Sequence, residues 1–142
     1  IKSKNLINTT YESLMFSLDM IKPGVLLGDL GSFIQNYAED RNFSVVREFC
    51  GHGIGRVFHD EPNILHYGVE GSGIEIREGM FFTVEPMVNA GKPGTKMLPD
   101  GWTAVTRDRS LSAQFEHSIG VTADGVEIFT KSHNNTGNPI AL

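Results

Sequence analysis

At residues 49–62 the chain reads Phe49-Cys50-Gly51-His52-Gly53-Ile54-Gly55-Arg56-Val57-Phe58-His59-Asp60-Glu61-Pro62. Two histidines, His52 and His59, lie seven positions apart, a spacing that would put both on one face of a helix. Alternating glycines in the same stretch make a helix unfavourable. They are typical of an irregular or bulged strand that another group approaches closely. We expect that group to be a metal ion or a substrate peptide. The alternative is a glycine-rich connection with two surface histidines.

The chain before this stretch has helical spacing. Residues 1–8 are expected to form a tail, and Thr9 and Glu12 have the spacing of a capping box at a helix start. Apolar residues then recur every three or four positions until Pro23-Gly24 ends the helix. A second helix is expected over residues 28–42.

The chain around and after this stretch has the pattern of strands. A loop is expected over 63–74, a two-residue hairpin turn at Asp124-Gly125, and a polar tail over 131–142. The predicted strands are 45–50, 81–88, 102–106, 114–121 and 126–130. The predicted fold class is therefore α+β, with two helices followed by a mostly antiparallel sheet.

Size and composition indicate an ordinary globular domain. With 142 residues the chain is one domain or a piece of one, and its start at Ile1 indicates processing or a longer parent. A net charge of −5 argues against nucleic-acid and anionic-membrane partners. A single cysteine, Cys50, excludes an internal disulfide and fits a reducing compartment. We find no apolar run long enough to span a bilayer and no secretory leader, so we expect a cytoplasmic protein.

Two carboxylates interrupt predicted strands. Glu85 lies in an apolar run and precedes Pro86, which marks an edge or break. A buried carboxylate is costly unless it is paired or bound to a metal; pairing with Arg107 or Arg109 is the alternative. Glu116 shares a strand face with Gln114 if Phe115 and His117 occupy the other, and its alternative is a solvent-facing position.

His52, Glu85 and Glu116 together form a nitrogen–oxygen ligand set that suits Zn, Mn, Fe or Co. His59 nearby would supply a proton shuttle or an electrophile. Cys50 beside His52 could suggest a thiol nucleophile, but a buried cysteine is more often inert. The glycines lack the spacing of a dinucleotide-binding loop. Phe58, Met87 and Trp102 could line an apolar pocket or belong to the core.

Residues 45–129 resemble the type I methionine aminopeptidases, which have the pita-bread metallopeptidase fold, and residues 9–44 look similar as well. The matching motifs occur in the family's order. They are Val45 to Arg56, Phe58-His59 to Glu61-Pro62, Thr83 to Gly91, Asp100-Gly101-Trp102-Thr103 and Thr106 to His117.

The resemblance implies removal of the initiator methionine from nascent chains by a site with two divalent ions, Co, Mn, Fe or Zn. By resemblance His52, Glu85 and Glu116 are metal ligands, Glu116 bridging both ions, and Glu85 also carries the proton of the attacking water. His59 corresponds to the histidine that contacts the scissile peptide. Phe58 and Trp102 correspond to walls of the methionine pocket.

The chain departs from the family pattern in one large respect. Two aspartate ligands, which the family carries on strands before these helices, have no counterpart here. We therefore expect residues 1–142 to be one catalytic domain that lacks the N-terminal half of the fold, with at most a partial metal site. Alone it is expected to be inactive and to expose a sheet edge that invites self-association, whereas the full enzyme is expected to be a monomer.

Two alternatives stay open at this point. The chain could be a pita-bread binding module without catalysis, with a protein or ribosome partner, or a proline-specific aminopeptidase or prolidase. The run Cys50 to Arg56 and Trp102 favour the methionine enzyme. The expected partners are N-terminal Met peptides and nascent chains, with the ribosome as a candidate, and neither nucleic acid nor membrane.

Overall fold

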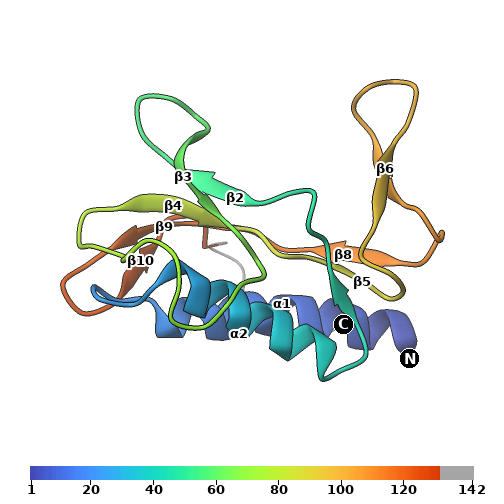
Figure 1. Cartoon of the computed structure of the whole chain (residues 1–142), viewed down its shortest axis with the longest axis horizontal. Helices are drawn as coiled ribbons and strands as arrows, with labels where there is room; N and C mark the ends of the chain where they lie inside the picture. The colour runs from blue at the N-terminus through green and yellow to red at the C-terminus, as the bar shows by residue number, and fades with distance from the viewer. Residues whose placement is uncertain (132–142) are drawn as a thin grey trace.

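The computed structural model describes residues 1–131, so the predicted tail 131–142 lies outside the described residues apart from Lys131. Two helices lie side by side beneath the strands (Figure 1). None of the helices within residues 1–131 has the length and apolar character needed to cross a membrane. In chain order the elements are α1 (Lys2–Met20), α2 (Leu27–Glu39), β1 (Ser44–Val45), β2 (Gly51–Gly53), β3 (Asp60–Ile64), β4 (Phe81–Val84), β5 (Met87–Asn89), β6 (Thr95–Met97), β7 (Ala104–Thr106), β8 (Ser112–Gln114), β9 (His117–Val121) and β10 (Val126–Ile128).

Helix α1 begins at Lys2, so the prediction of a tail over residues 1–8 was wrong. Leu6 is fully buried and extends the apolar face of the helix towards the N-terminus. The expected capping box does not form, since the helix has no side-chain cap. Thr10 instead donates its hydroxyl to the Leu6 carbonyl at 2.7 Å. Glu12 accepts a hydrogen bond from Tyr37 of α2 at 2.9 Å and so ties the two helices together.

Helix α2 confirms the second predicted helix, and it carries the segment 65–76 on its surface. The N–H groups of Leu27 and Gly28 donate to the carbonyls of Ile74 and Ser72, both at 2.9 Å. A Cβ on Gly31 would lie 2.8 Å from the Leu65 carbonyl oxygen, closer than side chains are found. Glycine therefore lets this segment run directly against the helix backbone.

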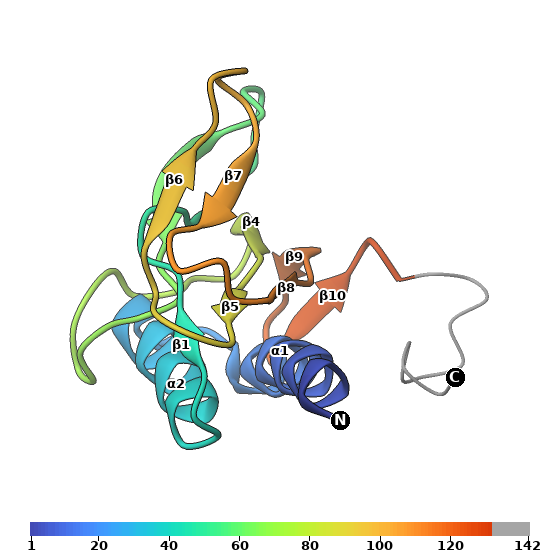
Figure 2. The same ribbon diagram turned by 90° about the vertical axis from the view of Figure 1, so that its right-hand side faces the viewer.

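All strand pairs in the described part of the chain are antiparallel, as expected. A five-stranded sheet has the order β10-β9-β4-β2-β3, a three-stranded sheet has the order β1-β5-β8, and β6 pairs with β7. Apolar side chains from both helices and from the two larger sheets form one core. The β6–β7 hairpin projects away from this body (Figure 2).

Two predicted strands, 81–88 and 114–121, are each broken in the middle. The first becomes β4 and β5 with Glu85-Pro86 between them, and the second becomes β8 and β9 with Phe115-Glu116 between them. Val84 pairs with His117 before the break and Met87 with Gln114 after it. Because the register is unchanged across the break, Glu85 lies opposite Glu116.

Other boundaries also differ from expectation. The predicted strand 45–50 is irregular after β1, and β3 occupies the start of the predicted loop 63–74. The strand expected over 102–106 begins at Ala104 and pairs with β6, which the sequence pattern did not reveal. The β9–β10 hairpin is present, but Val121 pairs with Val126, so its loop has four residues rather than two.

Asp108 closes the base of the β6–β7 hairpin. Its carboxylate accepts the backbone N–H of Lys92 at 2.7 Å and that of Ser110 at 3.0 Å. These hydrogen bonds, that from Lys92 above all, lower the pKa of Asp108 from 3.8 to about 2. A carboxyl whose folded pKa is depressed stabilises the fold above its unfolded pKa and loses this effect as the pH falls through the folded value.

We therefore expect Asp108→Asn to be less stable than the parent at pH 5. The difference should shrink as the pH falls towards 2, because the parent's own carboxylate is then protonated. Denaturant midpoints measured for both proteins from pH 5 to pH 2 test this. A stability difference that does not change with pH would contradict it.

Candidate functional site

One cavity of about 610 Å³ brings all the predicted site residues together. Its lining residues come from β2 and the segments beside it, from the two strand breaks with β5 and β8, and from the β6–β7 hairpin, so its walls come from segments far apart in the sequence. Cys50 and Met87 also line it. The predicted residues are His52, Phe58, His59, Glu85, Trp102 and Glu116.

His52 lies on β2, between β3 and β4, and is 8% exposed. The strand has a register shift between His52 and Gly53, which confirms the predicted irregular strand. A Cβ on either flanking glycine would collide with a neighbouring backbone carbonyl, that of Thr83 at Gly51 and that of Glu61 at Gly53. The groups that approach these glycines are therefore adjacent strands, not the metal or peptide that we expected.

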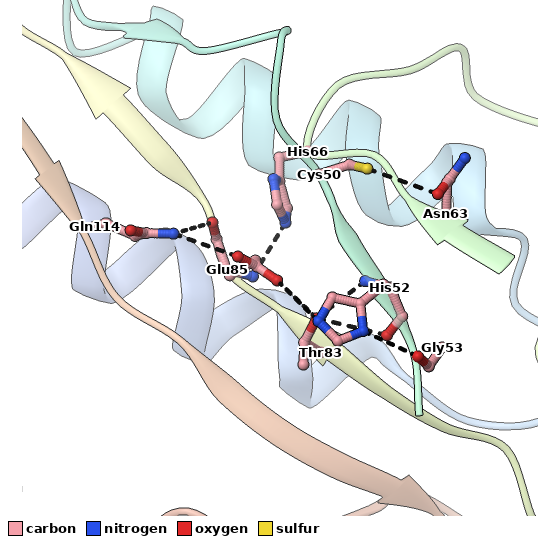
Figure 3. Close-up of polar contacts among 8 residues, drawn as sticks. All are labelled: Cys50, His52, Gly53, Asn63, His66, Thr83, Glu85 and Gln114. Carbon is pink, nitrogen blue, oxygen red and sulfur yellow. Dashed lines mark hydrogen bonds and ion pairs between the residues drawn. The ribbon is translucent and has the colours of Figure 1, made fainter. Parts of the chain in front are cut away.

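The ring of His52 has a defined orientation. Its Nδ1 lies 2.9 Å from the carbonyl oxygen of Gly53. A carbonyl can only accept, so in the neutral ring the proton is on Nδ1 and the lone pair of Nε2 is free. Nε2 lies 3.8 Å from Oε1 of Glu85, too far for a hydrogen bond. Two lone-pair donors thus face each other across a gap (Figure 3), as in a site for a cation.

Glu85 is held by polar contacts on both sides. The Thr83 hydroxyl donates to its Oε1 at 2.8 Å, and Nε2 of Gln114 lies 3.4 Å from its Oε2 (Figure 3). The alternative partner Arg107 donates to the carbonyl of Thr95 instead. Within residues 1–131 the basic side chain found within 4 Å of the Glu85 carboxylate is that of His52.

The environment of Glu85 raises the pKa of its carboxyl above the usual value. Burial raises the pKa of Glu85, the hydrogen bond from Thr83 opposes this, and the negative charge of Glu116 raises the pKa further. A carboxyl of this kind is suited to holding and releasing a proton.

The site fits a metal ion only in part. His52 and Glu85 supply one nitrogen and one oxygen donor, the chemistry that Zn, Mn, Fe or Co accepts. In the described part of the chain, however, no three His, Cys, Asp or Glu side chains gather closely enough to hold an ion. Glu116 lines the cavity opposite Glu85 without completing such a group, so its role as a ligand stays a prediction.

The open side of the cavity is aromatic. The His59 ring centroid lies 4.4 Å from that of His52 and 4.7 Å from that of Phe58. Phe58 is 73% exposed and Trp102 is 87% exposed, so neither belongs to the core. Aromatic side chains that can contact an apolar group thus line the same cavity as His52 and Glu85.

Sequence reasoning missed two residues behind the site. Thr83 could have been found, because it lies two positions before Glu85 on the same strand face. His66 could not, since no spacing relates it to Glu85. Its Nε2 accepts the backbone N–H of Glu85 at 3.0 Å, and burial lowers the pKa of His66 to about 4. Burial also raises the pKa of the Cys50 thiol, which disfavours a thiolate nucleophile.

Comparison with known proteins gives consistent results. The profile described as metallopeptidase family M24 matches residues 2–123. A methionine aminopeptidase of Rickettsia prowazekii is 59% identical over 98% of this chain and 54% of its own length. A crystal structure of methionine aminopeptidase from that organism superposes with a TM-score of 0.89 at 60% identity, covering 92% of this chain and 53% of that one.

The methionine aminopeptidase of Thermotoga maritima superposes with a TM-score of 0.90 at 45% identity, over 92% of this chain and 53% of that structure. The chain thus has the pita-bread fold and spans about half the length of the curated relatives it matches.

Proposed function

The chain belongs to metallopeptidase family M24, and we propose that it forms half of the catalytic unit of an enzyme that removes the N-terminal methionine from polypeptides. The observation that carries this proposal is the gathering of His52, His59, Glu85 and Glu116 around one cavity with an aromatic rim. The identity with methionine aminopeptidases over nearly the whole chain supports it.

In this proposal His52 and Glu85 would hold a divalent ion, and Glu116 would contribute a further carboxylate from the break between β8 and β9. The chain supplies part of a two-ion site, and the remaining ligands belong to the other half of the complete enzyme. When bound, the ions would lower the pKa of water and polarise the substrate carbonyl. The physiological metal is one of Co, Mn, Fe and Zn.

The side chains of this chain would then carry the remaining steps. Glu85, with its raised pKa, takes a proton from the attacking water and delivers it to the leaving amine. His59, exposed beside His52, donates a hydrogen bond to the scissile peptide. Phe58 and Trp102 enclose the methionine side chain, an unbranched apolar group that packs well against aromatic rings.

The proposed substrates are nascent chains and other peptides that begin with methionine. Action on nascent chains places the enzyme in the cytoplasm, next to the ribosome, and a single cysteine suits that reducing compartment. The comparisons favour neither a proline-directed peptidase nor a binding module without catalysis.

We expect the whole protein, loaded with Mn²⁺ or Co²⁺, to cleave a Met-Ala-Ser peptide and to leave an Ala-Pro peptide uncut. The isolated 142-residue chain should be at least ~100-fold slower, because a two-ion clamp needs ligands that it lacks. Liquid chromatography of released methionine measures both rates. If the isolated chain cleaves the Met-Ala-Ser peptide and Glu85→Ala abolishes that activity, the proposal that this chain holds only part of the metal site is wrong. If the whole protein cleaves only the Ala-Pro peptide, the proposed substrate is wrong.

A further inference from the structure

His66 occupies a rigid position outside the cavity. Its side chain is 2% exposed, and its chain neighbours Leu65 and Tyr67 lie directly against Gly31 of α2, with no room for a Cβ. Two backbone hydrogen bonds from the start of α2 hold the far end of the same segment. The backbone that carries the imidazole therefore cannot shift towards α2 without displacing the helix.

The ring of His66 reaches the backbone of Glu85 at the point where strand pairing is interrupted. The ladder between β4 and β9 ends at Val84, and Pro86 has no N–H to continue it. At this break the N–H of Glu85 donates to Nε2 of His66 at 3.0 Å (Figure 3). The His66 side chain thus provides the hydrogen-bond acceptor for a backbone N–H that lies beyond the end of the β4–β9 pairing.

This contact holds the backbone from which the carboxylate of Glu85 extends. His66 holds the backbone N–H of Glu85. At the other end of this residue, Oε1 of the carboxylate lies 2.8 Å from the Thr83 hydroxyl and 3.8 Å from Nε2 of His52. Without the histidine, residue 85 would be free to turn at the break. The carboxylate would then lose its direction towards His52.

We propose that His66 is a positioning residue for Glu85: the Nε2 lone pair holds the Glu85 N–H and thereby aims the carboxylate at His52. This inference rests on the proposed function, because it assigns to His66 the orientation of a group that binds metal and moves a proton. His66 itself touches neither the cavity nor the reacting atoms.

Three variants of the whole protein separate this role from simple packing. His66→Gln keeps an acceptor at the reach of Nε2. His66→Asn keeps an amide whose acceptor reaches only the Nδ1 position, and His66→Leu removes the acceptor. For the Asn and Leu variants we expect Mn²⁺ affinity, measured by calorimetry, and kcat for a Met-Ala-Ser peptide to fall by ~10–100-fold, the usual effect of losing an outer hydrogen bond. The Gln variant should stay within ~3-fold of the parent in both quantities, and KM should change little in any variant.

Two further measurements test the contact itself. In the metal-free protein the amide proton of Glu85 should exchange faster and shift upfield in NMR spectra of the Asn and Leu variants, but not of the Gln variant. Ile76→Ala is the matched control, since Ile76 is fully buried in the same segment. It should lower stability and leave the Glu85 amide and the Mn²⁺ affinity unchanged.

Equal losses in the Gln and Asn variants would overturn the proposal, as would an unchanged Glu85 amide in the Leu variant. If the parent binds Mn²⁺ but cleaves no Met peptide, the proposed function fails, while the calorimetric and NMR comparisons still decide the role of His66.

Discussion

Glu85→Gln should reduce kcat of the whole protein on a Met-Ala-Ser peptide by ~10²–10⁴-fold, the range usual for loss of a general acid–base group. The amide has the size of the carboxyl, so the backbone contact with His66 and a hydrogen bond from Thr83 can persist. What is lost is the negative charge beside His52 and the capacity to hold a proton. Kinetics at saturating Mn²⁺, with metal content measured in parallel, separate slower chemistry from weaker binding.

Glu127→Gln is the matched control, because Glu127 is an exposed residue of β10 that does not line the cavity. Its kcat should equal that of the parent. If the Glu85→Gln enzyme retains more than about a third of the parental kcat at saturating metal, its rate exceeds that expected after loss of a general acid–base group. Glu85 would then have no part in the proposed mechanism.

Gly31→Ala should destabilise the fold by about 2 kcal/mol or more, although in an isolated helix the same change is stabilising by about 1 kcal/mol. The added Cβ meets backbone carbonyls of Leu65 and Tyr67, and backbone cannot turn aside as a flexible side chain does. The segment that carries His66 must therefore lift from α2. Chemical denaturation followed by circular dichroism measures the loss.

Asn36→Ala in the same helix provides the control, since Asn36 is exposed. It should be neutral or slightly stabilising because alanine has the higher helix propensity. If Gly31→Ala proved as stable as Asn36→Ala, the close packing of segment 65–76 on α2 would be wrong, and with it the anchoring of His66.

The fold class was predictable because two periodicities are plain in the sequence. Apolar residues recur at helical spacing before residue 42, and extended segments with turn residues follow. The start of α1 was not predictable, because residues 2–8 are mostly polar and carry no helical repeat of apolar residues. Leu6 is the one buried residue among them, and a single buried leucine does not define a periodicity.

The site was predictable to the extent that its residues are chemically out of place. A carboxylate in an apolar run, Glu85, and a histidine among glycines, His52, both signal a need for a partner. The pairing of Glu85 opposite Glu116 needed the strand register, which the sequence does not display. His66 resembles any histidine near a tyrosine in a loop, and only the tertiary packing of its segment on α2 reveals its contact.

The unchanged register across the two strand breaks restricts how proteins with this architecture can vary in length. One residue inserted between Val84 and Glu85, or removed beside Glu116, would turn every later side chain of that strand to the opposite face. A carboxylate would then enter the core while Val88 faced water. Insertions and deletions that evolution tolerates should therefore concentrate in the tip of the β6–β7 hairpin and in the β9–β10 loop. A change in the number of residues there leaves Glu85 opposite Glu116.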